Sequence, residues 1–263
     1  MLTVLATTML ACRPAETGAA ESWTVQVLRS ETVDDDYCIY VHVPAACQEG
    51  ACSAIYYLDA DWNTALFREL LPDHPALDPL ISVGIGYPDP GALNRNRDYL
   101  SPYDEREPLS GGGEQFYGFL TDELVPWVEA RWPIAAEPGN TLLGHSYGGY
   151  FAAWVLYQEA ALAHPVFPRL LSASPTLGWA DDHLLQVDLD QATLGSAQTP
   201  RKLFLGMGEF EDTLSLVAFD TLVAQLAERD EDGFASRDQS YAGADHDDTG
   251  PLVLIDGLGF LAE

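Results

Sequence analysis

Basic residues are scarce in this sequence, and their scarcity excludes one class of partner. Of its 263 residues, 12 are Lys or Arg and 41 are Asp or Glu, so the formal net charge is −29. This charge repels phosphate backbones and anionic lipid headgroups, so we expect no nucleic-acid partner. Because the acidic residues are spread along the whole chain, we interpret them as a solubility feature suited to a salty or competitive environment.

The apolar run at the N-terminus, Met1 to Ala11, is too short to span a bilayer. It ends in Met-Leu-Ala-Cys12 before a polar linker, and it is similar to the end of a bacterial lipoprotein signal in which Cys12 would carry the lipid. It lacks Lys and Arg, and Met9 replaces the usual Leu, so an ordinary secretion signal or a mis-set start codon stays open. We predict a leader and linker over residues 1–21, export to the periplasm or the exterior, and membrane attachment only through Cys12.

Cysteines are also few, with three besides Cys12. No His or Cys partners stand at metal-ligand spacing, so we expect no zinc site. In an exported protein, Cys47 and Cys52 are placed to close a short loop, which would leave Cys38 as a buried thiol. A bond between Cys38 and Cys47 is the alternative pairing.

The remaining chain, residues 22–263, has no internal repeat or low-complexity tract, and 47% of the full sequence is hydrophobic. This composition suits a single α/β domain. Alternating residues predict two antiparallel strands, and continuous apolar runs predict parallel ones. The predicted strands cover residues 23–28, 37–43, 53–58, 80–87, 140–144, 170–173, 203–207 and 234–241. Helices are expected over 114–132, with a bend at Pro126, and over 214–226 and 251–261. Alternating strands and helices predict a mostly parallel sheet with helices on both faces.

A Gly-x-Ser-x-Gly motif spans Gly144, Ser146 and Gly148, between an apolar strand run and a helix with an apolar face. The glycines let strand and helix pass closely, and the turn holds the serine in a strained conformation. The motif therefore predicts Ser146 as a nucleophile. Without the strand and helix around it, the same motif would indicate no more than a tight packing turn.

A serine hydroxyl needs a base, and in α/β hydrolases the chain order is serine, acid, histidine. His42, His74 and His145 precede Ser146, His164 lies in a linker, and His183 lies before the penultimate strand. His246 alone follows the last strand, and this position predicts it as the base.

The acid should follow the strand 203–207, where Glu209, Glu211 and Asp212 are available. Asp212 is also placed to cap the next helix, so we favour Glu211, with Asp212 as the alternative acid. Glu209, or no acid at all, stays open.

An oxyanion hole needs two amides, and we expect them from Tyr147 and from the loop after strand 53–58, at Asp61 or Ala60. Aromatic residues in the loops are candidates for a substrate pocket, although each also suits the core or the rim. We place Trp62, Tyr99 and Trp179 at the substrate, with Tyr87 and Tyr103 as further candidates.

Several segments together resemble the esterase family of α/β hydrolases that includes enterochelin-type siderophore esterases, S-formylglutathione hydrolase, feruloyl esterases and mycolyl transferases. The resembling segments are Tyr57-Leu-Asp-Ala-Asp-Trp-Asn63, Val83-Gly-Ile-Gly-Tyr87, Arg97-Asp-Tyr-Leu-Ser-Pro102, Gly113-Glu-Gln-Phe, Asp122-Glu-Leu-Val-Pro126, Gly144-His-Ser-Tyr-Gly-Gly149, Ser172-Ala-Ser-Pro-Thr-Leu-Gly-Trp179, Asp245-His246 and Gly257-Leu-Gly-Phe-Leu261. The resemblance implies an α/β-hydrolase fold, with Ser146 as nucleophile and His246 as base. Ala60 stands where relatives often have Gly, and some siderophore esterases work with Ser and His alone.

We therefore expect a serine carboxylesterase that needs no cofactor and acts on a small-molecule ester. An acyltransferase with the same site is the first alternative. A catalytically silent hydrolase-fold binding protein is the second, although binding alone has no need of both Ser146 and His246.

Overall fold

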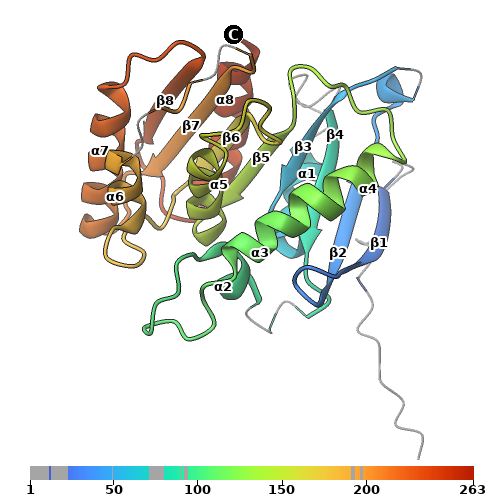
Figure 1. The fold of residues 1–263 in the computed structure, drawn as a ribbon, viewed down its shortest axis with the longest axis horizontal. Helices are drawn as coiled ribbons and strands as arrows, with labels where there is room; N and C mark the ends of the chain where they lie inside the picture. Colours follow the sequence, from blue (N-terminus) through green and yellow to red (C-terminus); the bar gives the residue numbers. More distant parts are fainter. Residues whose placement is uncertain are drawn as a thin grey trace, which may run out of the picture.

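The strands form one twisted sheet in the computed structural model, which describes residue 12 and residues 23–48, 50–70, 80–89, 91, 94–190, 193–195 and 198–263. The strand order is β1-β2-β4-β3-β5-β6-β7-β8 (Figure 1). The strands are β1 (Trp23–Ser30), β2 (Asp35–His42), β3 (Ser53–Tyr57), β4 (Leu80–Gly86), β5 (Thr141–His145), β6 (Arg169–Ala173), β7 (Arg201–Gly208) and β8 (Phe234–Tyr241).

Strand direction follows the sequence patterns. β1 pairs antiparallel with β2, and β2 pairs antiparallel with β4, so the two alternating strands form one edge of the sheet. The pairs from β4 through β8 are all parallel. Every residue of β4 is buried, as its largely unbroken apolar run predicted for a strand covered on both faces. The mostly parallel α/β sheet is confirmed.

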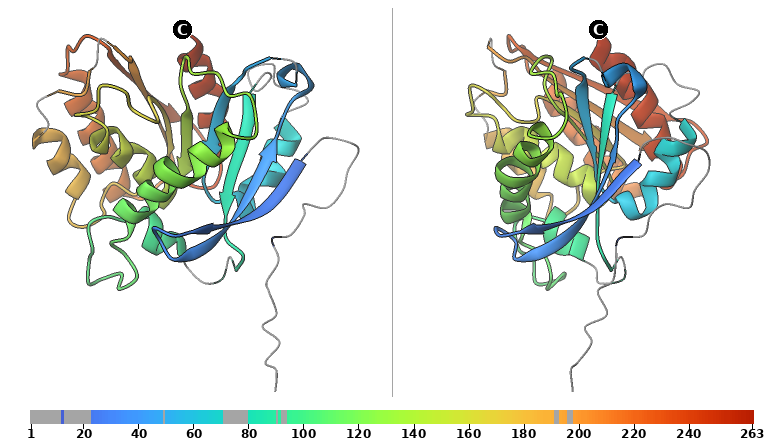
Figure 2. Two further views of the ribbon diagram at one scale, coloured as in Figure 1. Left: turned by 45° about the vertical axis from the view of Figure 1, so that its right-hand side comes forward. Right: turned by 90° about the vertical axis from the view of Figure 1, so that its right-hand side faces the viewer.

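Helices cover both faces of this sheet. They are η1 (Ala45–Cys47), α1 (Ala60–Leu70), α2 (Asn94–Tyr99), α3 (Gly113–Gly118), η4 (Phe119–Leu124), α4 (Val125–Glu129), α5 (Tyr147–Gln158), α6 (His183–Asp190), α7 (Thr213–Ala227) and α8 (Thr249–Ala262). The right-hand view of Figure 2 shows α1 and α8 on one face and the green helices, α3 to α5, on the other. Within the described residues, no helix is both long and apolar enough to cross a membrane.

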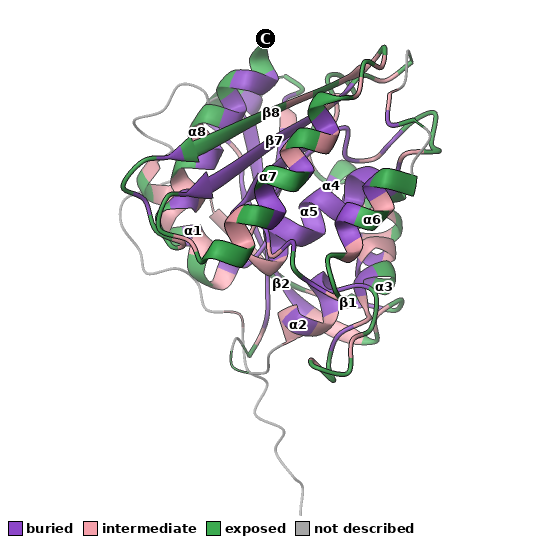
Figure 3. Cartoon of the chain, turned by 90° about the vertical axis from the view of Figure 1, so that its left-hand side faces the viewer, coloured by how far each residue is buried: buried purple, intermediate pink, exposed green. Residues whose placement is uncertain are grey.

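Each face has its own apolar core. One core packs α1 and α8 on the sheet and includes Phe67 and Leu254, whereas the other includes Phe116 and Phe151 beneath α3 and α5. The outer strand β8 is mostly exposed, as Figure 3 shows in green. The carboxyl ends of β5, β7 and β8 are therefore held by two packed layers, and the loops that follow these strands can carry reactive side chains.

The segment predicted as one helix bent at Pro126 is divided by a π-helical turn, η4, between α3 and α4. Pro126 lies in the first turn of α4. Proline lacks an N–H and crowds the carbonyl four residues earlier, so the wider π turn just before it accommodates the ring.

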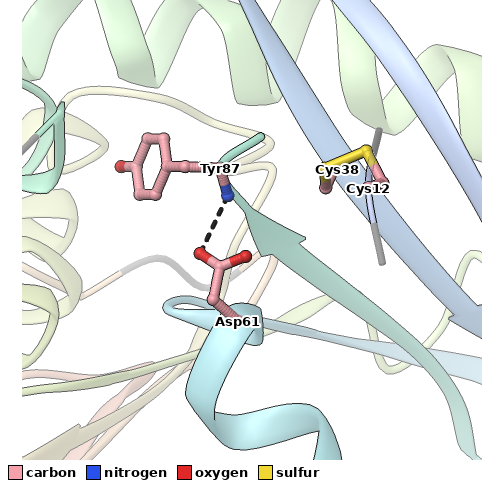
Figure 4. The surroundings of a disulfide bond; sticks show 4 residues. All are labelled: Cys12, Cys38, Asp61 and Tyr87. Atoms are coloured by element: carbon pink, nitrogen blue, oxygen red, sulfur yellow. Dashed lines mark hydrogen bonds between the residues drawn. A yellow bond between two sulfur atoms is a disulfide. The ribbon is translucent and has the colours of Figure 1, made fainter. Parts of the chain in front are cut away.

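The cysteine pairing corrects one prediction. Cys47 and Cys52 form the predicted disulfide, but Cys38 is bonded to Cys12 and is not a free thiol (Figure 4). Cys38 is completely buried in β2. Sequence spacing does not reveal this bond because Cys12 lies 26 residues away. One sulfur cannot hold both a disulfide and a lipid thioether, so this pairing and a lipid on Cys12 exclude each other.

Candidate active site

Ser146 occupies a strained turn between β5 and α5. Its backbone has φ of 62° and ψ of −118°, and its amide donates a 2.9 Å hydrogen bond to the carbonyl of Ala173 on β6. A Cβ on Gly144 would lie 2.0 Å from the carbonyl oxygen of Gly148. No side chain fits there, so the glycine of the motif is a steric requirement. A serine with positive φ at a strand-to-helix crossing has the geometry expected of a nucleophile elbow.

His246 lies in the loop between β8 and α8 and meets Glu211, which follows β7. Its Nδ1 lies 2.9 and 3.0 Å from the two carboxylate oxygens of Glu211. The Glu211 side chain is 6% exposed, whereas the His246 side chain is 42% exposed. A buried carboxylate at Nδ1 orients the ring and leaves Nε2 free to accept a proton.

The three carboxylates after β7 have separate partners. Asp212 caps α7 and accepts hydrogen bonds from the amides of Leu214 and Ser215, at 2.9 and 3.1 Å. Hydrogen bonds from the hydroxyl and amide of Ser215 lower the pKa of Asp212. Glu209 accepts a 2.7 Å bond from the amide of Gly243. The structure thus places Glu211 at His246, Asp212 at the helix cap and Glu209 at the turn after β8.

Ser146 and His246 line one cavity of about 410 Å³, together with Asp59, Trp62, Asn63, Arg95, His145 and Asp247. The residues come from the carboxyl ends of β3, β5 and β8 and from α1 and α2. No group of three or more His, Cys, Asp or Glu side chains in the described ranges could hold a metal ion. Among the described lining residues, Ser146 and the oriented His246 thus share the cavity with the positively charged guanidinium of Arg95.

Comparison with known proteins identifies the family. The family model described as a putative esterase matches residues 30–249. The chain belongs to this esterase family. The α/β-hydrolase fold is confirmed, and the protein is an enzyme of the class that acts on ester bonds.

Individual relatives cover most or part of the chain. This chain is 27% identical over 259 residues to ferri-bacillibactin esterase BesA of Bacillus subtilis, and the alignment covers 90% of this chain and 88% of the relative. This chain is also 34% identical over 139 residues to the siderophore triacetylfusarinine C esterase of Aspergillus fumigatus, and this alignment covers 49% of this chain and 46% of the relative. The BES protein of Bacillus cereus superposes with a TM-score of 0.81 at 24% identity, covering 95% of this chain and 98% of that one.

The residues expected to donate the amides of the oxyanion hole lie at the starts of two helices. Tyr147 is the first residue of α5, so its amide has no acceptor within the helix. Asp61 lies in the first turn of α1, with its side chain turned away to accept a 2.8 Å hydrogen bond from the amide of Tyr87 (Figure 4). Burial raises the pKa of Asp61 to about 6, although the Tyr87 amide opposes this shift.

The prediction of aromatic residues at the substrate pocket needs correction. Trp62 is 57% exposed and lines the cavity, as predicted. Tyr99 and Trp179 are buried and are not among the described lining residues. Their polar atoms face protein: the Tyr99 hydroxyl accepts from the amide of Asp59, and the Trp179 indole donates to the carbonyl of Pro102. Both residues support the site from behind. Tyr87 is likewise buried, and Tyr103 is exposed outside the cavity lining.

His145 is one lining residue whose contact the motif did not predict. Its Nε2 donates a 2.7 Å hydrogen bond to the backbone carbonyl of His246, and the two rings are 4.6 Å apart. Burial lowers the pKa of His145, which favours the neutral ring. Thr249 donates a second bond to the same carbonyl at 3.0 Å. The loop that carries His246 is thus tied to His145, the residue before Ser146.

Arg95 is another lining residue that the sequence did not predict. Its Nε and Nη2 donate to the two oxygens of Asp59 at 2.9 and 3.0 Å, and Asp59 has a left-handed backbone with φ of 54°. The sequence signal was available but weak, because Arg95 is one of only 12 basic residues and stands two positions before the Arg97 segment. Nothing in the sequence indicated its partner.

Proposed function

We propose that this esterase hydrolyses carboxylic esters through a covalent acyl-enzyme on Ser146. The observation that carries the proposal is the pairing of His246 with the buried Glu211, in the same cavity as the strained Ser146. Serine, acid and base follow the chain order of α/β hydrolases and come from the ends of β5, β7 and β8.

The chemistry follows from this arrangement. His246 Nε2 takes the Ser146 proton while Oγ attacks the ester carbonyl, and the amides of Tyr147 and Asp61 stabilise the resulting oxyanion. The alcohol leaves with the proton from His246, and a water activated by the same nitrogen releases the acid. The half-exposed ring of His246 lets solvent water reach the base, as hydrolysis requires.

The substrate class is proposed from the relatives. They are esterases of siderophores, which are iron chelators, and one of them matches 90% of this chain. We propose a siderophore ester as the natural substrate. An open cavity next to the exposed Trp62 suits a large ligand of which only the scissile ester enters the site.

Ser146→Ala tests the proposal. Hydrolysis of p-nitrophenyl butyrate by the variant should fall by about 10³-fold or more, with an unchanged melting temperature, because the hydroxyl serves chemistry and not packing. A fluorophosphonate probe should label the wild type and not the variant. Residual activity within about tenfold of the wild type would remove Ser146 from the mechanism.

We further propose that the protein is exported, with residues 1–21 as leader and linker to one catalytic domain over 22–263. The two disulfides support an oxidising compartment. Mass spectrometry of protein from the native cell envelope and medium distinguishes the N-terminal chemistries. A peptide linking Cys12 to Cys38 would support a soluble exported enzyme, whereas a diacylglycerol on Cys12 would establish a lipid anchor.

A further inference from the structure

The active-site cavity contains a cation whose charge is already neutralised. Arg95 is the one Lys or Arg among the described lining residues, and it makes a two-bond ion pair with Asp59. The two side chains are only 17% and 4% exposed. A bidentate pair with this little exposure is stable, because separating it would leave a buried charge without a partner. The pair therefore adds no net charge to the cavity.

Aromatic rings hold Arg95 in place. Its guanidinium carbon lies 5.1 Å from the ring of Tyr147, 5.4 Å from Trp62 and 5.6 Å from Tyr99. Cation–π contacts on several sides limit how far the guanidinium can turn toward an incoming anion. Its Nη1 has no hydrogen-bond partner among the described residues, so it can donate to a neutral carbonyl oxygen without leaving Asp59.

The other charges at the cavity are negative. Asp247 lines the cavity and is exposed, and Asp245 and Asp248 flank it in the same loop. The carboxylate of Asp245 accepts from the amides of Asp247 and Asp248, which keeps this acidic turn beside His246. Glu211 adds a buried negative charge behind the ring. A negatively charged substrate would meet these carboxylates with no free cation in the described lining to compensate.

We propose that the active site selects electrically neutral esters and discriminates against esters with negative charge near the scissile bond. This inference rests on the proposed esterase function. Among siderophores it favours those whose iron complex is uncharged, such as trihydroxamates, over trianionic tricatecholates. Arg95 would then act as a hydrogen-bond donor to a substrate carbonyl and not as an anion receptor.

Two p-nitrophenyl esters of equal chain length test the proposal directly. The butyrate is neutral, and the monosuccinate carries a carboxylate where the butyrate has its methyl group. After correction for the alkaline hydrolysis rates of the two esters, kcat/KM should favour the butyrate by about tenfold or more at low salt. The preference should shrink toward about 1 M salt, where the Debye length is about 3 Å. A ferric trihydroxamate ester should likewise be hydrolysed faster than a ferric tricatecholate ester.

Charge variants locate the effect. Asp247→Asn should raise the monosuccinate-to-butyrate ratio of kcat/KM by about three- to tenfold. Asp220→Asn removes the same charge from the exposed surface of α7, outside the cavity lining, and should leave the ratio unchanged. Equal shifts in both variants would overturn the inference, since the net charge of the whole protein would then set the preference.

The remaining outcomes are also distinguishable. An equal or higher corrected kcat/KM for the monosuccinate would overturn the charge preference and leave the esterase function intact. Hydrolysis of neither ester, together with no labelling of Ser146 by the fluorophosphonate probe, would overturn the proposed function itself.

Discussion

The serine side and the histidine side of the active site are built in different ways. Ser146 is placed by backbone sterics within one continuous segment, where β5 turns into α5 and Gly144 allows no side chain. His246 is placed by side-chain contacts to residues far away in the chain, namely Glu211 and His145. The first half is a rigid crossing of two elements, whereas the second is an assembly of loops.

Because of this difference, we expect mutations on the two sides to have different effects. A side chain added at Gly144 should damage the fold, because strand and helix cannot move apart without disturbing both cores. A change in the histidine contacts should damage turnover first, because the loops can relax while the sheet persists. The following variants test whether stability and turnover divide in this way.

The largest expected effect is on the histidine side. Glu211→Gln should lower kcat by about 10²- to 10⁴-fold, because a neutral amide, unlike the carboxylate, neither stabilises the imidazolium nor enforces the right tautomer of His246. The neighbouring Asp212→Asn is the matched control and should mainly loosen the start of α7, with kcat nearly unchanged. The reverse ranking would move the acid to Asp212, and two near-neutral variants would indicate a Ser-His dyad.

The second largest effect is expected on the serine side, at the turn between β5 and α5. Gly144→Ala should lower the free energy of unfolding by about 2–4 kcal/mol, because its Cβ would overlap the backbone of Gly148. Gly259→Ala in α8 is the control, since nothing lies within 4 Å of an added Cβ. It should stabilise the protein by about 0.5–1 kcal/mol. Urea unfolding measures both, and equal stability of the two variants would refute the rigid crossing.

His145 tests the contact between the two halves. His145→Ala removes the donor to the His246 carbonyl and should lower kcat by about 10- to 100-fold, with little change in KM. His145→Gln retains an N–H donor and should recover much of the loss. An unchanged kcat and pH profile in the alanine variant would show that Thr249 alone holds the loop.

The smallest expected effect concerns Asp61 at the start of α1. Its pKa is about 6 in the folded protein against an ordinary 3.8, so the folded state favours the protonated form. Stability therefore falls as the pH rises through this interval and stays lower above it. Asp61→Asn keeps an acceptor for Tyr87 and should raise the melting temperature by about 2–4 °C at pH 8. A gain of the same size at pH 4 would show that the carboxylate charge is not the cause.

Much of this protein was predictable from sequence alone, because the relevant signals are local. Apolar runs and alternation indicated the strands, and the parallel sheet followed from them. The spacing of Gly144, Ser146 and Gly148 indicated the elbow, and elimination by chain order singled out His246. Helix capping is equally local, so Asp212 could be recognised as a competitor for the cap. For the strands, the elbow and the cap, neighbours along the chain dictate the conformation, whereas His246 was found from the order of residues along the whole chain.

The tertiary structure alone decided which distant side chains meet. It selected Glu211 from three adjacent carboxylates, joined Arg95 to Asp59, set His145 against the carbonyl of His246 and bonded Cys12 to Cys38. It also placed Tyr99 and Trp179 behind the cavity, although their aromatic character suits a pocket equally well. These contacts depend on how loops from separate strands converge at one edge of the sheet. A linear pattern does not encode this convergence, because partner choice there depends on distances and burial that exist only after the two cores have packed.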